Sequence, residues 1–130
     1  MMRGSGLADC LESPHLWQDA TAAALVPKDL ENAEKYLKDA PGKKDAIEQL
    51  NTAYQAIYYA AQALMHSIYY KSSGFRCVIT VLEEFFVKKG KLDVKHVDAF
   101  NRALKLEGKP AENIELAASF IEATKQILGK

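Results

Sequence analysis

The sequence predicts an all-α protein, an up-and-down antiparallel bundle of four to five helices, on three observations. Apolar residues recur at helical spacing in several separate segments. Proline and glycine mark the breaks between these segments. The connecting loops are short, so consecutive helices should pack antiparallel. No convincing strand is predicted, because the β-branched run Cys77–Leu82 continues into a helical pattern.

The segment from Lys43 to Lys71 is predicted to be the central helix, since neither proline nor glycine interrupts it. A second row of small side chains would let a neighbouring helix approach its backbone. A helix this apolar is usually enclosed by partners on several sides. Its apolar seam, at steps of three and four, is Ile47, Leu50, Tyr54, Ile57, Ala61, Leu64 and Ile68, and the small row is Ala46, Ala53, Ala60 and Ser67.

Four further helices follow from the same spacing. Lys28–Ala40 is amphipathic and is stopped by Pro41 and Gly42. Arg76–Lys89 ends at Gly90, with lysines in its last turn. The next helix is capped by Asp93, and the last begins at Pro110 and runs to about Leu128.

Residues 1–26 are predicted to be a partly helical N-terminal arm, and residues 27–130 the bundle domain. Ser13 and Pro14 suit a helix start, followed by an apolar stripe at Leu16, Trp17, Ala20 and Ala24. Two hypotheses remain open for this arm. It covers a groove of its own domain, or it reaches a second subunit.

Composition limits the function classes. The 130 residues carry a formal net charge of zero, so no strong overall field draws the protein towards nucleic acid or membrane. No apolar run approaches the ~18 residues of a membrane span, so no membrane association is expected. Cys10 and Cys77 are able to pair, but we expect reduced thiols and a cytoplasmic location, with Cys77 a buried structural thiol.

From the reactive residues and their spacing, we expect no catalytic site, no cofactor and no metal. Asp93 and His96 have the spacing of one bundle metal motif, but its second copy is missing, so Asp93 is interpreted as a cap and His96 as a surface residue. His66 is interpreted as a partly buried, hydrogen-bonded structural histidine. The sequence contains neither a Gly-rich phosphate loop nor G-x-S-x-G.

Two features of the sequence, a local excess of basic residues and a set of tyrosines, indicate a candidate ligand site. Residues 88–109 hold seven basic and three acidic side chains, hence +4 on a neutral chain. Such a run is a solvated face or a patch for phosphate or RNA. Tyrosines at helical spacing are core residues or stacking groups beside the basic ones. The candidate ligand-binding residues are Arg76, Lys88, Lys89, Lys91, Lys95, Tyr58 and His66.

The order of four segments, LENAEKYLKDA, AYQAIYYAAQALM, FFVKKGKLD and ELAASFIEATKQIL, resembles HEPN domains, the "higher eukaryotes and prokaryotes nucleotide-binding" family. The resemblance covers about Asp29 to Leu128 and leaves the arm outside. It implies an up-and-down helical bundle that forms a homodimer. Family members include ribonucleases, toxins of toxin–antitoxin pairs, partners of small nucleotidyltransferases, and noncatalytic binding domains.

The nuclease members carry an Arg followed by a His after four to six residues, and this chain has no such pair: after Arg76 the next histidine is His96. The sequence therefore predicts a noncatalytic binding and dimerisation module whose candidate partners are a nucleotide or a nucleotidyltransferase, with weak, salt-sensitive binding of nucleotide or RNA. The alternative is a HEPN-type ribonuclease with a nonstandard active site.

Overall fold

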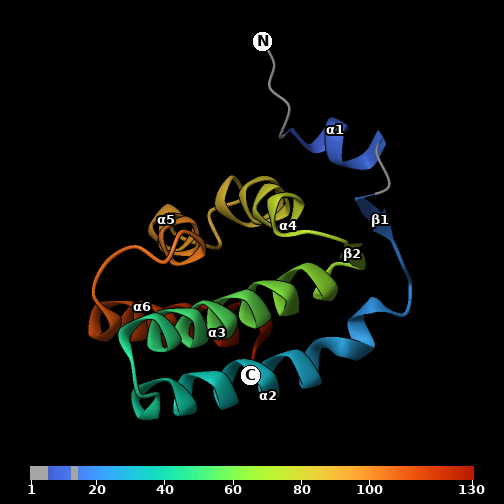
Figure 1. Ribbon diagram of the computed structural model, residues 1–130. Coiled ribbons are helices and arrows are strands. Elements are labelled where there is room, and N and C mark those ends of the chain that lie inside the picture. Colours follow the sequence, from blue (N-terminus) through green and yellow to red (C-terminus); the bar gives the residue numbers. More distant parts are fainter. Residues whose placement is uncertain (1–5, 13–14) are drawn as a thin grey trace.

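The computed structural model describes residues 6–12 and 15–130, and this part of the chain is mostly helical (Figure 1). The predicted all-α class is thus confirmed in its coarse form. The elements in chain order are α1 (Leu7–Glu12), β1 (Leu16–Gln18), the 3-10 turn η1 (Ala22–Leu25), α2 (Val26–Asp39), the 3-10 turn η2 (Ala40–Gly42), α3 (Ala46–Ser67), β2 (Tyr70–Ser72), α4 (Phe75–Leu82), the π-helical turn η3 (Glu83–Val87), α5 (Val94–Leu104) and α6 (Pro110–Leu128).

Helix α3 lies at the centre of the fold, as its sequence predicts. It packs against α2, α6, α5 and α4, and Figure 1 shows α2 on one side of the α3–α6 layer and the α4–α5 layer on the other. Eleven of its 22 residues are buried. Alanines with no exposed surface, among them Ala53 and Ala60, line its contacts and allow the close approach that the small row predicts. Large side chains such as Ile57, Phe100 and Phe120 fill the space between the layers.

The predicted central helix is four residues too long at its C-terminal end and three at its N-terminal end. It begins after Asp45, whose carboxylate accepts a hydrogen bond from the Glu48 amide at 2.8 Å. It ends at Ser67, because Tyr69 adopts a left-handed backbone conformation with φ of 71°. Ile47, placed on the buried seam by its spacing, is 61% exposed in the first turn; the buried seam starts at Leu50.

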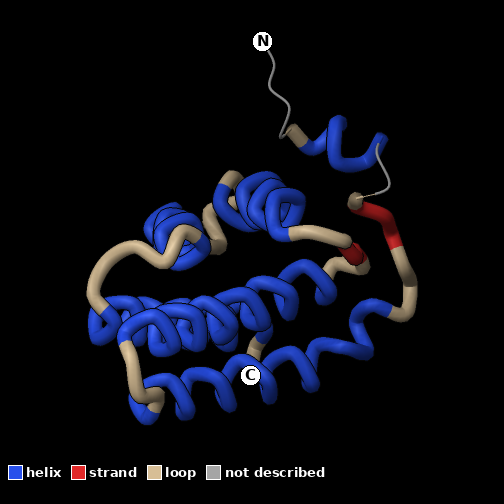
Figure 2. The backbone as a smooth tube through the Cα atoms, viewed as in Figure 1, coloured by secondary structure: helices blue, strands red, loops and turns tan. Residues whose placement is uncertain are grey.

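Two short strands correct the expectation of no strand and of a helix around Leu16. β1 and β2 pair antiparallel, with Leu16 opposite Ser72 and Gln18 opposite Tyr70 (Figure 2). Strands of three residues are too short to show an alternating pattern. Leu16 is buried and anchors the arm on its own bundle, which agrees with the first hypothesis for the arm. The predicted helix start at Ser13 and Pro14 lies outside the described residues.

The helix predicted for Arg76–Lys89 contains a change of period that the sequence does not reveal. Regular α4 gives way after Leu82 to the wider turn η3, and the Lys88 amide donates to the Glu83 carbonyl five residues back at 3.0 Å. Phe86, within this turn, lies in the core at 2% exposure. Asp93 caps α5 by accepting from the Lys95 amide at 2.9 Å, as predicted, and Pro110 opens α6.

Within the described residues, no helix combines the length and apolar character required to cross a lipid bilayer.

Candidate ligand pocket at the start of α4

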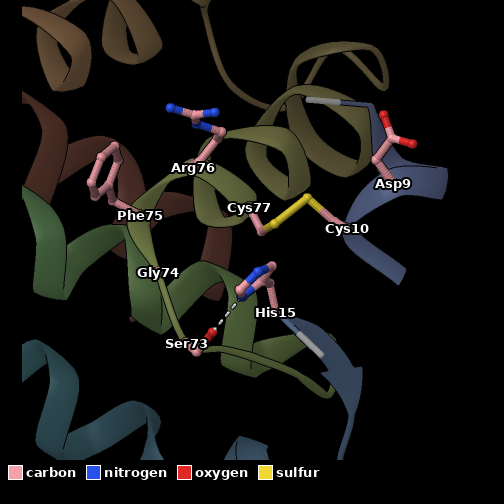
Figure 3. Close-up of a pocket in the computed structure, with 8 residues that line it drawn as sticks. All are labelled: Asp9, Cys10, His15, Ser73, Gly74, Phe75, Arg76 and Cys77. Atoms are coloured by element: carbon pink, nitrogen blue, oxygen red, sulfur yellow. Dashed lines mark hydrogen bonds between the residues drawn. A yellow bond between two sulfur atoms is a disulfide. The ribbon is translucent and has the colours of Figure 1, made fainter. Parts of the chain in front are cut away.

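A pocket of about 430 Å³ lies where the arm meets the first turn of α4. Figure 3 shows its eight lining residues, which come from two stretches of the chain, one holding Asp9, Cys10 and His15 and the other residues 73–77. α1 supplies Asp9 and Cys10, the residue before β1 is His15, the turn after β2 supplies Ser73 and Gly74, and α4 supplies Phe75, Arg76 and Cys77.

The strand pair explains how His15 reaches this pocket. Because Leu16 pairs with Ser72, the residues just outside the pair, His15 and Ser73, meet across the strands. The Ser73 amide donates to the His15 carbonyl at 3.1 Å, and the His15 Nδ1 lies 3.1 Å from the Ser73 hydroxyl. Because His15 lies 58 positions from Ser73, no local sequence pattern indicates that the two side chains meet.

The two cysteines form a disulfide, which corrects the prediction of reduced thiols. Cys10 and Cys77 have Cα atoms 5.9 Å apart and are joined across 67 positions of sequence. Cys77 is buried, as predicted, but bonded and not a free thiol. The two cysteines therefore do not indicate a reducing compartment.

The turn before α4 is fixed by its own hydrogen bonds. The Ser72 hydroxyl donates to the Gly74 carbonyl at 2.6 Å, and the Gly74 amide donates back to the same hydroxyl at 3.1 Å. α4 then begins without a side-chain cap. Phe75, at its first position, is 39% exposed, and Arg76 is exposed beside it. An aromatic face and a guanidinium thus stand together at the pocket's edge.

A second hollow of about 410 Å³ shares this pair of residues. Phe75 and Arg76 line both hollows. The second hollow is lined by Phe75, Arg76, Ile79, Thr80, Glu83, Asn101 and Leu104.

Among the predicted ligand residues, the first pocket includes Arg76 and leaves out the four lysines. Lys88 forms an ion pair with Glu84 at 2.7 Å on η3. Lys91 lines a third hollow, with Ala123, Gln126 and Ile127 of α6. Twelve positions separate Arg76 from Lys88 along one helical run, a span of roughly 18 Å at ~1.5 Å per residue. The lysine cluster and Arg76 are therefore separate features of the surface.

Tyr58 belongs to an aromatic group between α3 and α5. Its ring meets Phe100 edge-on with centroids 6.3 Å apart, and Tyr54 lies 5.9 Å away. Burial raises the pKa of the Tyr58 hydroxyl above its ordinary value, although a hydrogen bond with Gln62 opposes the rise. Burial raises the pKa of Tyr54 as well. These tyrosines pack the core, the interpretation that the helical spacing favoured.

His66 is a buried, hydrogen-bonded histidine, as the sequence predicts. Its Nδ1 lies 2.6 Å from the Asp29 Oδ2, and both side chains are under 10% exposed. The pair joins α2 to α3 inside the bundle. It is absent from the lining of the pocket at the start of α4, so its role in the described structure is to hold two helices together.

His96 is not the surface residue that its spacing indicated. It is 7% exposed, with its ring edge-on to Phe120 at 5.7 Å. Burial and the neighbouring Lys95 lower the pKa of His96 below its ordinary value. Within the described residues, no group of three side chains is placed to hold a metal ion.

Asp19 is the most strongly perturbed carboxyl near the strand pair. Hydrogen bonds from the Thr21 hydroxyl and amide, together with Lys71, lower its pKa to about 2. Lys71 Nζ lies 3.2 Å from Asp19 Oδ2 and ties the end of β1 to β2. This ion pair steadies the strands that place His15 at the pocket.

The pocket's chemistry suits binding. Figure 3 shows the Arg76 guanidinium and the His15 imidazole on opposite sides of the Cys10–Cys77 bridge, with Asp9 on the α1 side. A guanidinium offers donors to an anion, and the exposed Phe75 ring offers a flat apolar face. The formal charges of Arg76 and Asp9 cancel, so the site does not resemble a general polyanion patch.

Comparison of the chain with protein-family models, with curated proteins and with solved structures finds no match in any of the three.

Proposed function

We propose that this chain is a noncatalytic binding module whose pocket at the start of α4 holds a small organic anion, with a nucleotide as the class that the HEPN resemblance implies. One observation carries the proposal: the exposed Phe75 and Arg76 border the pocket side by side. A guanidinium pairs with one phosphate or carboxylate group, and an aromatic ring stacks a flat apolar group.

Binding is favoured over catalysis by the directions of the side chains. Proton transfer to or from a phosphodiester requires a histidine within hydrogen-bond reach of the reacting atoms, and a cation holding the same phosphate. His15 instead faces Ser73, on the far side of the disulfide bridge from the Arg76 guanidinium in Figure 3. A single phosphate held by Arg76 is thus not presented to the imidazole.

The ribonuclease hypothesis has one observation in its favour. The fold brings an arginine and a histidine, Arg76 and His15, to the lining of one pocket, although the sequence separates them by 61 positions. The control variant for an RNA cleavage assay is therefore His15→Ala. We expect no cleavage of single-stranded RNA by the wild type; cleavage that disappears in His15→Ala would establish the enzyme.

The same proposal includes the HEPN-like bundle topology, a homodimer, a nucleotidyltransferase as candidate partner in a toxin–antitoxin-like pair, and a cytoplasmic location. The dimer is supported by large apolar side chains left open beside the strand pair, with Trp17 42% and Tyr69 53% exposed. Light scattering at micromolar concentration is expected to give a dimer mass, and a monomer mass would contradict this part.

The binding experiment compares two chemically matched arginines. Calorimetric titration of the oxidised protein with AMP is expected to give weak, salt-sensitive binding that is lost in Arg76→Gln. Arg102→Gln serves as the control, because Arg102 pairs with Glu112 at 2.9 Å and does not line the pocket. Equal loss in both variants, or loss only on replacing Lys89 and Lys91 with Glu, would contradict the assignment.

The salt dependence of AMP affinity distinguishes binding through one charged contact from binding through several. A single arginine–phosphate pair should lose affinity gradually as salt screens the two charges, whereas binding through several lysines should depend on salt more steeply. A steep slope would move the site from the pocket to the lysine cluster of residues 88–95.

A further inference from the structure

The Cys10–Cys77 disulfide joins a marginal element to a stable one, at the wall of the pocket. Cys77 belongs to α4, whose Val78 and Val81 have no exposed surface. Cys10 belongs to α1, six residues long. Both cysteines line the pocket, so the bridge is itself part of the ligand site.

Helix α1 packs against α4 and β1, and the bridge is its covalent link to α4. Cys10 is its buried residue, Leu7 packs partly against the core, and Leu11 is 44% exposed. Helices shorter than about 12 residues are marginal in water without tertiary support. We therefore expect the position of α1, and with it that of Asp9, to be sensitive to loss of the bond from Cys10.

The strand that follows is anchored independently. β1 pairs with β2, Leu16 is 2% exposed, and Lys71 holds Asp19 at 3.2 Å. Breaking the disulfide should release α1, residues 7–12, and leave the strand pair in place. The change would be local, at one wall of the pocket.

The surroundings of the two sulfur atoms set the direction of exchange. Cys77 is the third residue of α4, where the helix start stabilises a thiolate, although the residue is only 7% exposed. The more stable thiolate is the better leaving group in thiol–disulfide exchange. By this criterion Cys77 is the expected leaving group, and an attacking thiol must reach Cys10, which is 3% exposed, through the pocket that both cysteines line.

We propose that the Cys10–Cys77 bridge is a redox-controlled clasp, which an external dithiol opens to release α1 and weaken ligand binding in the pocket. The part that concerns ligand affinity rests on the function proposed above. The release of α1 does not, because it follows from the placement of the bridge alone.

The reaction is a two-step exchange with a dithiol, either a small molecule or a protein of that class. A thiolate of the dithiol attacks Cys10 Sγ, the Sγ–Sγ bond breaks, and its electron pair leaves on Cys77 Sγ, which then takes a proton from water. The dithiol's second sulfur, as a thiolate, attacks its partner sulfur in the mixed disulfide and releases Cys10 as a thiolate, which is protonated in turn. The protein disulfide is reduced by two electrons, and the dithiol is oxidised to a disulfide.

Hydrogen exchange of the full chain tests the release without any ligand. After treatment with dithiothreitol in native buffer, amides in residues 7–12 are expected to lose protection, while α3 keeps its protection and Trp17, the chain's one tryptophan, keeps its fluorescence. Cys10→Ser should show the open state from the start and should not respond to dithiothreitol. Reoxidation of the wild type should restore protection.

Three results would overturn the clasp. Residues 7–12 that stay protected after reduction would mean that packing alone holds α1. Protection lost throughout the bundle would mean that the bridge is a global structural bond. A disulfide that dithiothreitol reduces only in denaturant would not be a redox-controlled one.

AMP titration then tests the link to the pocket. Oxidised protein is expected to bind AMP about fivefold or more tightly than reduced protein, and by reciprocity AMP should favour the disulfide by the same factor. Equal affinities would remove the control of binding while leaving the release of α1 intact. If oxidised protein binds no AMP, the proposed ligand class is wrong. Hydrogen exchange of residues 7–12 then remains the test of the redox-controlled clasp.

Discussion

Replacing His66 with Leu should destabilise the fold through the buried pair with Asp29. Leucine is close to histidine in volume, so the substitution mainly removes the donor and leaves the Asp29 carboxyl without this partner at 6% exposure. Hydrogen bonds that involve a charged group contribute about 1.5–3 kcal/mol, and an orphaned buried polar group adds its own desolvation cost. We expect a loss of about 3 kcal/mol in the free energy of unfolding.

The expected change in melting temperature follows from the chain length. Unfolding entropy near ~2.1 cal/mol/K per residue gives about 0.27 kcal/mol/K for 130 residues. A loss of ~3 kcal/mol then lowers the melting temperature by about 10 °C. Thermal and urea unfolding followed by circular dichroism would measure both quantities.

A double-mutant cycle isolates the interaction. His66→Asn keeps an amide donor near the position of Nδ1 and should retain part of the stability, which makes it the matched control. Asp29→Ala combined with His66→Leu should cost less than the sum of the two single changes, because each single change already breaks the same contact. Strictly additive costs would refute the argument that this hydrogen bond is what stabilises α2 on α3. None of these variants should change AMP affinity, because neither residue lines the pocket.

Three other predictions concern the bridge, a buried histidine and a glycine. Reducing Cys10–Cys77 should lower the free energy of unfolding in urea by about 4 kcal/mol, because the bridge closes a loop spanning 67 positions in the unfolded chain; an unchanged midpoint would mean that the bond is absent in solution. Because burial lowers the native pKa of His96, the unfolded chain binds more protons, so stability should fall as pH drops below ~6.5. Urea midpoints on either side of that pH should differ less in His96→Phe. Gly108→Ala should cost more than about 1 kcal/mol, because φ is +93° and a Cβ would lie 3.0 Å from two side-chain nitrogens, whereas Gly42→Ala meets nothing within 4 Å and should be close to neutral.

The helical elements were predictable because their signals are local. The spacing of apolar residues along α3, the Asp93 cap and the proline that opens α6 each concern residues within a turn or two of one another. The predicted boundaries are therefore wrong by only a few residues. Ile47 shows what the spacing of apolar residues cannot predict. It has the spacing of the buried seam but is 61% exposed, because burial of the first turn depends on whether another helix extends over it.

The π turn and the strands needed the tertiary structure for a different reason. The turn η3 contains one residue more than a regular helical turn. A prediction from the spacing of apolar residues assumes an unchanged helical period and therefore does not detect the extra residue. β1 and β2 are stable only as a pair, and their 3-residue runs carry no separate signal.

The amino-acid sequence by itself determined that this protein is helical, where its helices begin and end to within a few residues, that His66 is buried, and that Arg76 is a candidate ligand residue. Only the tertiary structure decided that Cys10 bonds to Cys77 and that His15 joins Arg76 in one pocket. Helix formation depends on neighbours three or four positions away, so a linear pattern records it. A pocket depends on contacts between segments some 60 positions apart, and these exist only once the strands have paired and the helices have packed.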